Sequence, residues 1–148
     1  VKVGEDINAE ELKKDFDAIV LTCGSTIPRD LPIEGRESKD VHFAMELLLK
    51  NTKSLLDSSF ADENFIDVKD KNVIVIGGGD TGTDCVATSL RHGCKSITQF
   101  ELLPKPVEKV HTHESWLAKV RTFQIDYGQE EAKAIFGNDP REYCILTK

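Results

Sequence analysis

NVIVIGGGDTGTDCVATSLRHG, residues Asn72–Gly93, carries the clearest structural pattern in the chain. Within it, Val73–Ile76 is a short apolar run rich in β-branched residues, which is typical of a strand buried on both faces of a parallel sheet. A glycine-rich segment follows. A helical pattern then begins near Thr81 and ends before Gly93, a residue type common just after a helix. The segment therefore predicts a strand, a tight turn and a helix in an α/β fold.

The glycines after the predicted strand have the spacing G-x-G-x-x-G, at Gly77, Gly79 and Gly82. In this motif the first glycine permits a sharp turn, the second lets a pyrophosphate approach the backbone, and the third lets the helix pack closely on the strand. The free N–H groups and positive dipole at the helix N-terminus also attract phosphate. We therefore expect a dinucleotide site here; the alternative interpretation is a tight turn that binds no ligand. The residues expected at the site are Gly77, Gly78, Gly79, Asp80, Thr81 and Gly82.

An acidic residue follows the next predicted strand. Ser96–Phe100 is a plausible second parallel strand, and Glu101 comes directly after it, about 20 residues beyond the glycines. A carboxylate at this position can accept hydrogen bonds from both adenosine ribose hydroxyls and would repel a 2′-phosphate. We therefore expect NADH, and NADPH remains the less favoured alternative because Lys105 and Lys109 lie nearby. The other interpretation of Glu101 is an exposed charge at a strand end.

The composition excludes several classes of partner. The chain has 148 residues, of which 39% are hydrophobic and 30% are charged, and its formal net charge is −7. This negative charge argues against nucleic acid or an anionic membrane as a partner. No apolar run is long enough to span a bilayer. Because the chain begins with Val rather than Met, we interpret it as a segment of a longer polypeptide.

The cysteines and histidines do not predict a metal centre. The cysteines are Cys23, Cys85, Cys94 and Cys144. They have no C-x-x-C or other metal-ligand spacing, and no secretory signal pattern is present, so we expect reduced, buried, apolar side chains in a cytoplasmic protein. His111 and His113 lie in a predicted loop without an evident third ligand.

The remaining segments give weaker predictions. Ala9–Lys14 predicts a short helix, and Ala18–Leu21 predicts a buried strand that leads into a glycine-containing turn. Asp40–Leu49 has the pattern of a helix, whereas Asn51–Asp70 is polar, without a strong period, and is interpreted as a linker.

Two elements are predicted near the C-terminus. Gln129–Phe136 predicts a short helix that ends at Gly137. After a turn at Asp139–Arg141, Tyr143–Thr147 predicts a last apolar strand.

Several longer segments together resemble one family. They are Asp17–Gly35, Val41–Asp57, Val73–Gly93, Gln99–Pro106, Asp126–Gly128 and Phe136–Lys148. Their sequences resemble the pyridine-nucleotide-binding region of glutamate synthase, either the small subunit of the bacterial enzyme or the matching C-terminal part of the fused enzyme. A generic flavin-disulfide reductase would share only the glycine turn. The chain departs from the family between Pro106 and Arg121, where it has Trp116 alone in place of a Pro- and Trp-rich loop.

The resemblance implies a domain organisation. Residues 1–35 would be part of a split FAD-binding domain, in which Thr22, Cys23 and Gly24 form a flavin-contact turn. Residues 36–68 would be a connecting helix and excursion. Residues 69–148 would form a Rossmann-like NAD(P)-binding domain with a parallel sheet, truncated at its C-terminus.

The resemblance also implies a reaction. NADH would give a hydride to FAD, and electrons would pass through iron–sulfur centres to FMN elsewhere in the parent enzyme, where L-glutamate is made from L-glutamine and 2-oxoglutarate. The expected partners are the nicotinamide dinucleotide and the remaining domains or large subunit. No residue of this chain is expected to be catalytic, and the isolated chain is expected to bind NADH weakly, hold FAD poorly and lack activity. The alternatives are a related flavin-dependent pyridine-nucleotide oxidoreductase and a non-catalytic nucleotide-binding fragment.

Overall fold

The computed structural model describes residues 1–22, 24–25, 27–107 and 122–147. The chain divides into two compact units, Val1–Asp30 and Leu31–Lys148. The assignment of residues 1–35, 36–68 and 69–148 to functional domains stays a prediction. Across the described residues, no helix is both long and apolar enough to cross a membrane.

The first unit contains one of its two predicted elements. Helix α1 (Ala9–Asp15) confirms the predicted short helix, and the Asn8 side chain caps it by accepting a hydrogen bond from the Glu10 N–H. The strand predicted at Ala18–Leu21 is wrong, because residues 18–22 are exposed and form no strand pairing in the described part of this unit. A strand needs a hydrogen-bonded neighbour, and apolar β-branched residues alone do not supply one.

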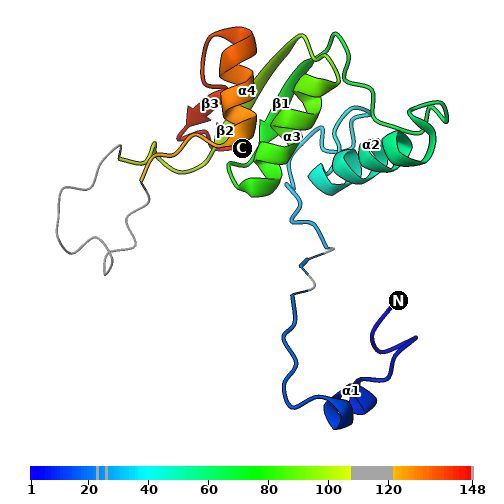
Figure 1. The fold of residues 1–148 in the computed structure, drawn as a ribbon. Coiled ribbons are helices and arrows are strands. Elements are labelled where there is room, and N and C mark those ends of the chain that lie inside the picture. Colours follow the sequence, from blue (N-terminus) through cyan, green and yellow to red (C-terminus); the bar gives the residue numbers. More distant parts are fainter. Residues whose placement is uncertain (23, 26, 108–121, 148) are drawn as a thin grey trace. The chain divides into compact units, whose positions relative to one another are not determined.

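The second unit is built on a parallel sheet whose three described strands lie in the order β1-β2-β3 (Figure 1). The strands are β1 (Asn72–Ile76), β2 (Ser96–Glu101) and β3 (Arg141–Tyr143). Gln99 in the middle strand pairs with Val75 on one side and with Arg141 on the other. The parallel pairing confirms the predicted α/β fold class.

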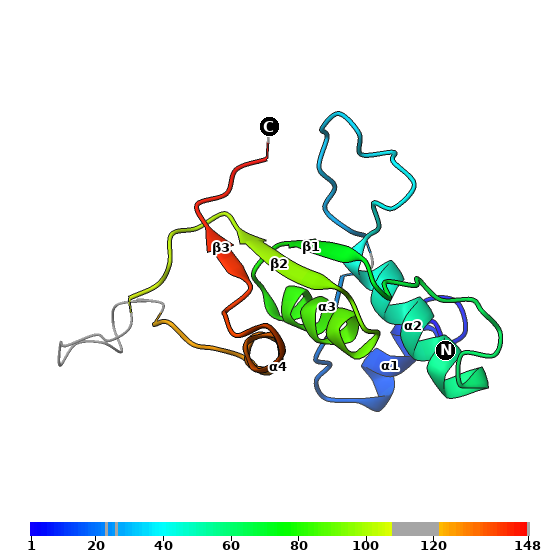
Figure 2. The same cartoon turned by 90° about the horizontal axis from the view of Figure 1, so that it is seen from above.

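Helices α3 (Asp80–Arg91) and α4 (Tyr127–Phe136) lie on the same face of this sheet (Figure 2). Val75 is buried on that face, whereas Ile74 and Ile76 point to the opposite face and are 60% and 54% exposed. The prediction that β1 is buried on both faces is therefore wrong, because both packed helices cover one side.

Small residues let the two helices approach closely. The buried residues of α3 are Thr83, Cys85, Val86, Ala87, Ser89 and Leu90. On α4, a Cβ built at Gly128 would lie 2.5 Å from the backbone oxygen of Thr83, so only glycine fits at this contact. The start of α4 is thereby held beside the first turns of α3.

Helix α2 (Ala44–Ser58) packs against α3 and is longer than the helix predicted at Asp40–Leu49. Part of the predicted linker is therefore helical. Its buried face consists of Leu47, Asn51 and Ser54, which follow helical spacing but are mostly polar. Asn51 is 2% exposed, and its amide bonds both backbone groups of Ile66, so a polar side chain satisfies this buried contact. The apolar core of the unit comprises Leu47, Val68, Val75, Cys85, Val86, Leu90, Cys94, Ile97 and Ala132.

The last two elements are displaced from their predicted bounds. Helix α4 begins at Tyr127, slightly before the predicted start at Gln129, and ends at Phe136 as predicted. Its C-cap, Gly137, has the left-handed backbone conformation, with a φ of 85°. The last strand is Arg141–Tyr143 rather than Tyr143–Thr147, because Cys144 adopts a positive φ of 59° that ends the extended backbone.

Candidate functional site

The turn between β1 and α3 is set by two glycines that other residues could not replace easily. Gly77 has a φ of +123°, a conformation that L side chains rarely adopt, and its N–H donates to the Phe100 carbonyl at 2.9 Å. A Cβ built at Gly82 would lie 2.4 Å from the Gly77 oxygen and 2.9 Å from Gln99 Nε2. Close packing of α3 on the turn therefore requires glycine at position 82.

Gly79 is different, because apart from its chain neighbours no described residue has an atom within 4 Å of a Cβ built there, and its φ of −82° suits any residue. Gly79 is also the N-cap of α3, so no side chain caps the first helical N–H groups. These first N–H groups have no side-chain cap and lie at the positive end of the helix dipole. The turn thus offers backbone donors with room for a phosphate beside them.

Glu101, the last residue of β2, lies directly against the turn. A Cβ built at Gly78 would be 1.6 Å from Glu101 Oε2, so the carboxylate occupies the space that a side chain at position 78 would fill. Glu101 Oε1 accepts a hydrogen bond from the Leu103 N–H at 3.3 Å. The structure therefore brings together the predicted glycine turn and the predicted acidic residue.

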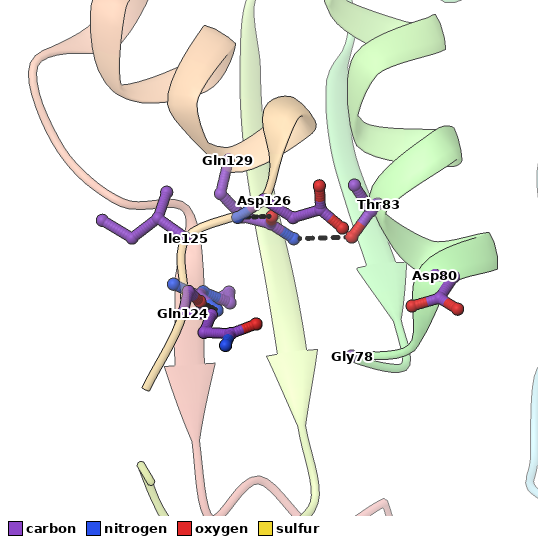
Figure 3. Close-up of a pocket in the computed structure, with 8 residues that line it drawn as sticks. Gly78, Asp80, Thr83, Gln124, Ile125, Asp126 and Gln129 are labelled. Carbon is purple, nitrogen blue, oxygen red and sulfur yellow. Dashed lines mark hydrogen bonds between the residues drawn. The ribbon is translucent and has the colours of Figure 1, made fainter. Parts of the chain in front are cut away.

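A pocket of about 320 Å³ opens between this turn and the start of α4 (Figure 3). Its lining residues are Gly78, Asp80, Thr83, Gln124, Ile125, Asp126, Gln129 and Arg141. Both helix N-termini border the pocket, but α4 is closed by a capping box. In that box the Asp126 carboxylate accepts from the helix backbone, and the Gln129 side chain accepts from the Asp126 N–H at 3.2 Å.

Two buried glutamines connect the two helix starts. Gln99 Nε2 donates to the Gly77 carbonyl at 2.9 Å, and Gln99 Oε1 accepts from Gln129 Nε2 at 2.8 Å. Gln129 Nε2 also donates to Thr83 Oγ1 at 3.0 Å, as Figure 3 shows. Gln99 is 0% exposed and Gln129 is 2% exposed. This chain of amides ties β1, β2, α3 and α4 together beneath the pocket.

An arginine–aspartate pair fixes the opposite wall of the pocket. Arg141 Nε and Nη2 donate to Asp139 at 2.9 and 2.7 Å, and Arg141 Nη1 donates to the Gln124 carbonyl at 2.9 Å. Burial alone would raise the pKa of Asp139, but the hydrogen bonds and charge of Arg141 outweigh burial and lower it. The guanidinium also lies 4.8 Å from the centre of the Phe123 ring. Arg141 therefore holds the segment that leads into α4.

Residues 1–125 match the pyridine nucleotide-disulphide oxidoreductase family. The chain belongs to this family. The match begins at the first residue and extends through β1, α3 and β2 to the segment that enters α4, so the family covers the glycine turn and Glu101. The Rossmann-like fold predicted from the sequence agrees with this membership.

Relatives within the family confirm the resemblance to glutamate synthase. The chain is 56% identical to "Glutamate synthase [NADH]" of Schizosaccharomyces pombe over its whole length, which covers 7% of that protein. It is 53% identical to "Glutamate synthase [NADPH] small chain" of Bacillus subtilis over 99% of its length. It is 50% identical to "Glutamate synthase [NADH]" of Saccharomyces cerevisiae, again over 99%. The chain spans 30% of the bacterial protein and 7% of the Saccharomyces protein.

The other predicted site residues belong to the first unit or fall outside the described residues. Thr22 and Gly24 belong to the first unit, where Thr22 is exposed and Gly24 has a φ of +67°, whereas Cys23 lies outside the described residues. Lys109, His111, His113 and Trp116 also lie outside them. In the described parts of the chain, no group of three potential metal ligands occurs.

The cysteine prediction is confirmed at two positions and wrong at a third. Cys85 and Cys94 are buried, and burial raises the pKa of Cys85 to about 11, so both side chains behave as small apolar groups. Cys144 is exposed because it follows the end of β3.

Sequence reasoning missed four residues that shape the site: Gln99, Asp126, Gln129 and Arg141. Two of them had a readable signal. Asp126 and Gln129 have the spacing of a capping box, which marks the first turn of a helix. Gln99 lies two residues after the buried Ile97, so both side chains face the helices. A polar residue in a strand does not by itself predict burial.

Proposed function

We propose that this chain seats the pyrophosphate and adenosine half of NADH in a glutamate synthase that makes L-glutamate from L-glutamine and 2-oxoglutarate. The open N-terminus of α3 beside Gly79 is the observation that carries the proposal. Gly77 to Gly82, including Asp80 and Thr81, would surround the pyrophosphate, and Glu101 would accept hydrogen bonds from the adenosine ribose. The names of the relatives support the choice of enzyme.

The residues present fit a dinucleotide. The space at Gly79 admits a phosphate, the uncapped helix supplies donors, and the carboxylate at the end of β2 lies against the turn. When bound, the nicotinamide group supplies a hydride for FAD. The chain's own contribution is to bind and orient the cofactor. Thr22, Cys23 and Gly24 would contribute one edge of an FAD site whose other parts lie in the remainder of the parent enzyme.

We propose NADH rather than NADPH on the position of Glu101. The names of relatives do not decide this point, because proteins named for each nucleotide share half or more of their aligned residues with the chain. A carboxylate against the turn would repel a 2′-phosphate. Iron–sulfur centres, FMN and the large subunit or further domains belong to the same proposal. A cytoplasmic location also belongs to it, supported by three free cysteines among the described residues.

The test is titration of the purified chain with NADH and NADPH, for the wild type and Glu101→Ala. We expect weak binding with a preference for NADH, and we expect that preference to shrink at least about threefold in the variant because the repulsion of the 2′-phosphate is lost. Glu142→Ala is the matched control, since it removes the same charge from an exposed position on β3. A wild type that prefers NADPH would refute the choice of nucleotide, and absence of binding would refute the site.

A second candidate is a related flavin-dependent pyridine-nucleotide oxidoreductase. The family match across residues 1–125 favours it, because this match does not by itself specify glutamate synthesis. Restoration of glutamate synthesis by this chain in place of the matching region of the Bacillus protein would decide for glutamate synthase.

A further inference from the structure

The two buried glutamines form a chain of hydrogen bonds with a single direction. At one end the donor is the backbone N–H of Asp126, and at the other end the acceptor is the Gly77 carbonyl. A backbone N–H can only donate and a carbonyl can only accept. Each glutamine amide must therefore present its oxygen toward Asp126 and its nitrogen toward Gly77. Neither amide can rotate by half a turn without breaking two bonds.

This direction fixes the first peptide of the glycine turn. The Gly77–Gly78 peptide is trans, so the Gly77 carbonyl and the Gly78 N–H point to opposite sides. Gln99 Nε2 and Gly82 of α3 lie on the side to which the carbonyl points, and the N–H of Gly78 consequently points away from them. Gly78 lines the pocket between the turn and α4. At a glycine with φ +123°, no side chain would otherwise resist rotation of this peptide.

We propose that Gln99, held by Gln129, is a positioning residue that directs the Gly78 N–H toward the pyrophosphate of the bound dinucleotide. This inference rests on the proposed function of the turn. An apolar side chain at position 99 would leave the half-buried Gly77 carbonyl without this hydrogen bond and its peptide free to rotate. Each nitrogen and oxygen of the two buried amides has a hydrogen-bond partner, and these bonds together hold the arrangement in one orientation.

The test uses the complete 148-residue chain with Gln99→Met, which keeps the length of the side chain but cannot donate to Gly77. The probes are NADH, ADP and adenosine, of which only adenosine lacks phosphate. We expect affinity for NADH and ADP to fall about tenfold, the size of one lost hydrogen bond to a charged group, while affinity for adenosine stays within about twofold.

Asn51→Leu is the matched control. Asn51 is an equally buried amide that bonds backbone groups of Ile66 far along the chain from the turn. This variant should lose stability without changing the ratio of ADP to adenosine affinity. If Gln99→Met does not fold, Gln99→Glu gives a second measurement, because the introduced side chain can donate to Gly77 when it is protonated and cannot when it is a carboxylate. The ADP affinity of Gln99→Glu should therefore rise as the pH falls.

The outcomes separate the two proposals. A selective loss of ADP and NADH affinity supports the role of Gln99. Unchanged ADP affinity, or an equal loss for ADP and adenosine, overturns that role while leaving the proposed nucleotide site intact. Absence of NADH and ADP binding to the wild type overturns the proposed function and this inference with it.

Discussion

Helices α3 and α4 begin beside the same pocket, but only the N-terminus of α4 is capped by side chains. Helix α3 starts at Gly79, which has no side chain to cap it, and the space around Gly79 is open. Helix α4 starts at Asp126, whose carboxylate and the Gln129 side chain complete a capping box. One helix therefore satisfies its first donors internally, and the other keeps them available.

The difference separates the requirements of folding from those of binding. Glycine at an N-cap forgoes roughly a few tenths of a kcal/mol relative to a capping side chain, a small cost that a bound phosphate would offset. The capped α4 supplies a rigid neighbouring wall and, through Gln129 and Gln99, holds the Gly77 carbonyl in place. The following variants test this division.

The largest effect is expected for Gly82→Ala. The added Cβ would lie 2.4 Å from the Gly77 oxygen, a backbone atom that cannot move without disrupting the turn. Alanine favours helices by about 1 kcal/mol, but the clash should dominate and lower the free energy of unfolding by about 3 kcal/mol. Urea denaturation measures this loss. Wild-type stability in this variant would show that the turn is not packed as described.

Gly79→Ala is the matched test at the open glycine. Because no described residue other than the chain neighbours has an atom within 4 Å of the new Cβ, stability should change by no more than about 1 kcal/mol. The methyl group would occupy the space needed by a phosphate, so NADH affinity should fall about thirtyfold. Calorimetric titration gives the affinity, and denaturation gives the stability. If NADH binds this variant as it binds the wild type, the pyrophosphate does not approach position 79.

Asp126→Ala removes the cap of α4. We expect a loss of about 1 kcal/mol in the free energy of unfolding, which is typical of an N-cap aspartate, and a smaller loss of NADH affinity than in Gly79→Ala. Asp6→Ala is a suitable control, because Asp6 is an exposed aspartate of the first unit. A larger loss of binding than of stability would mean that the Asp126 carboxylate contacts the ligand.

The smallest effect is expected at the far end of α3. His92 packs against the rings of Phe60 and Phe65, with centroid distances of 5.1 and 5.8 Å. Burial lowers the pKa of His92, and the charge of Asp67 only partly opposes this. The unfolded chain therefore takes up a proton first as the pH falls below about 6.5, and stability decreases until the folded pKa is passed.

His92→Gln should reduce this pH dependence and change the free energy of unfolding by no more than about 1 kcal/mol. The NADH affinity at neutral pH should not change. The free energy of unfolding measured by urea between about pH 5 and 8 provides the comparison. An unchanged slope in the variant would show that another group titrates.

The sequence predicted the elements whose boundaries are set by local chemistry. Gly77, Gly79 and Gly82 have a spacing that physical constraints on a βα turn impose. In the structure Gly77 has a φ of +123°, an added Cβ at Gly82 would clash, and the space at Gly79 is open. Gly137 marks the end of α4 because its left-handed conformation suits glycine. Glu101 was predicted because it directly follows a plausible strand, about 20 residues beyond the glycines.

Features that depend on distant partners were not predictable in the same way. The apolar run at Ala18–Leu21 looks like a strand, but pairing is a property of neighbours and not of the run. Beyond Leu49, the buried face of α2 consists of Asn51 and Ser54, which make polar contacts. The sequence therefore lacks the apolar period that would have predicted this part of the helix. The pairing of Gln99 with Gln129 joins residues on separate elements, and only the packing of α4 on α3 brings them together.

Backbone amide chemical shifts of the ¹⁵N-labelled chain during titration with NADH test the comparison most directly. We predict that the largest shifts occur at Gly78 to Gly82, where α3 begins without a cap. The amides of Tyr127, Gly128 and Gln129, which begin the capped α4, should shift less. Larger shifts at the start of α4 than at the glycine turn, or no saturable shift at either, would contradict the assignment of the nucleotide to the open helix.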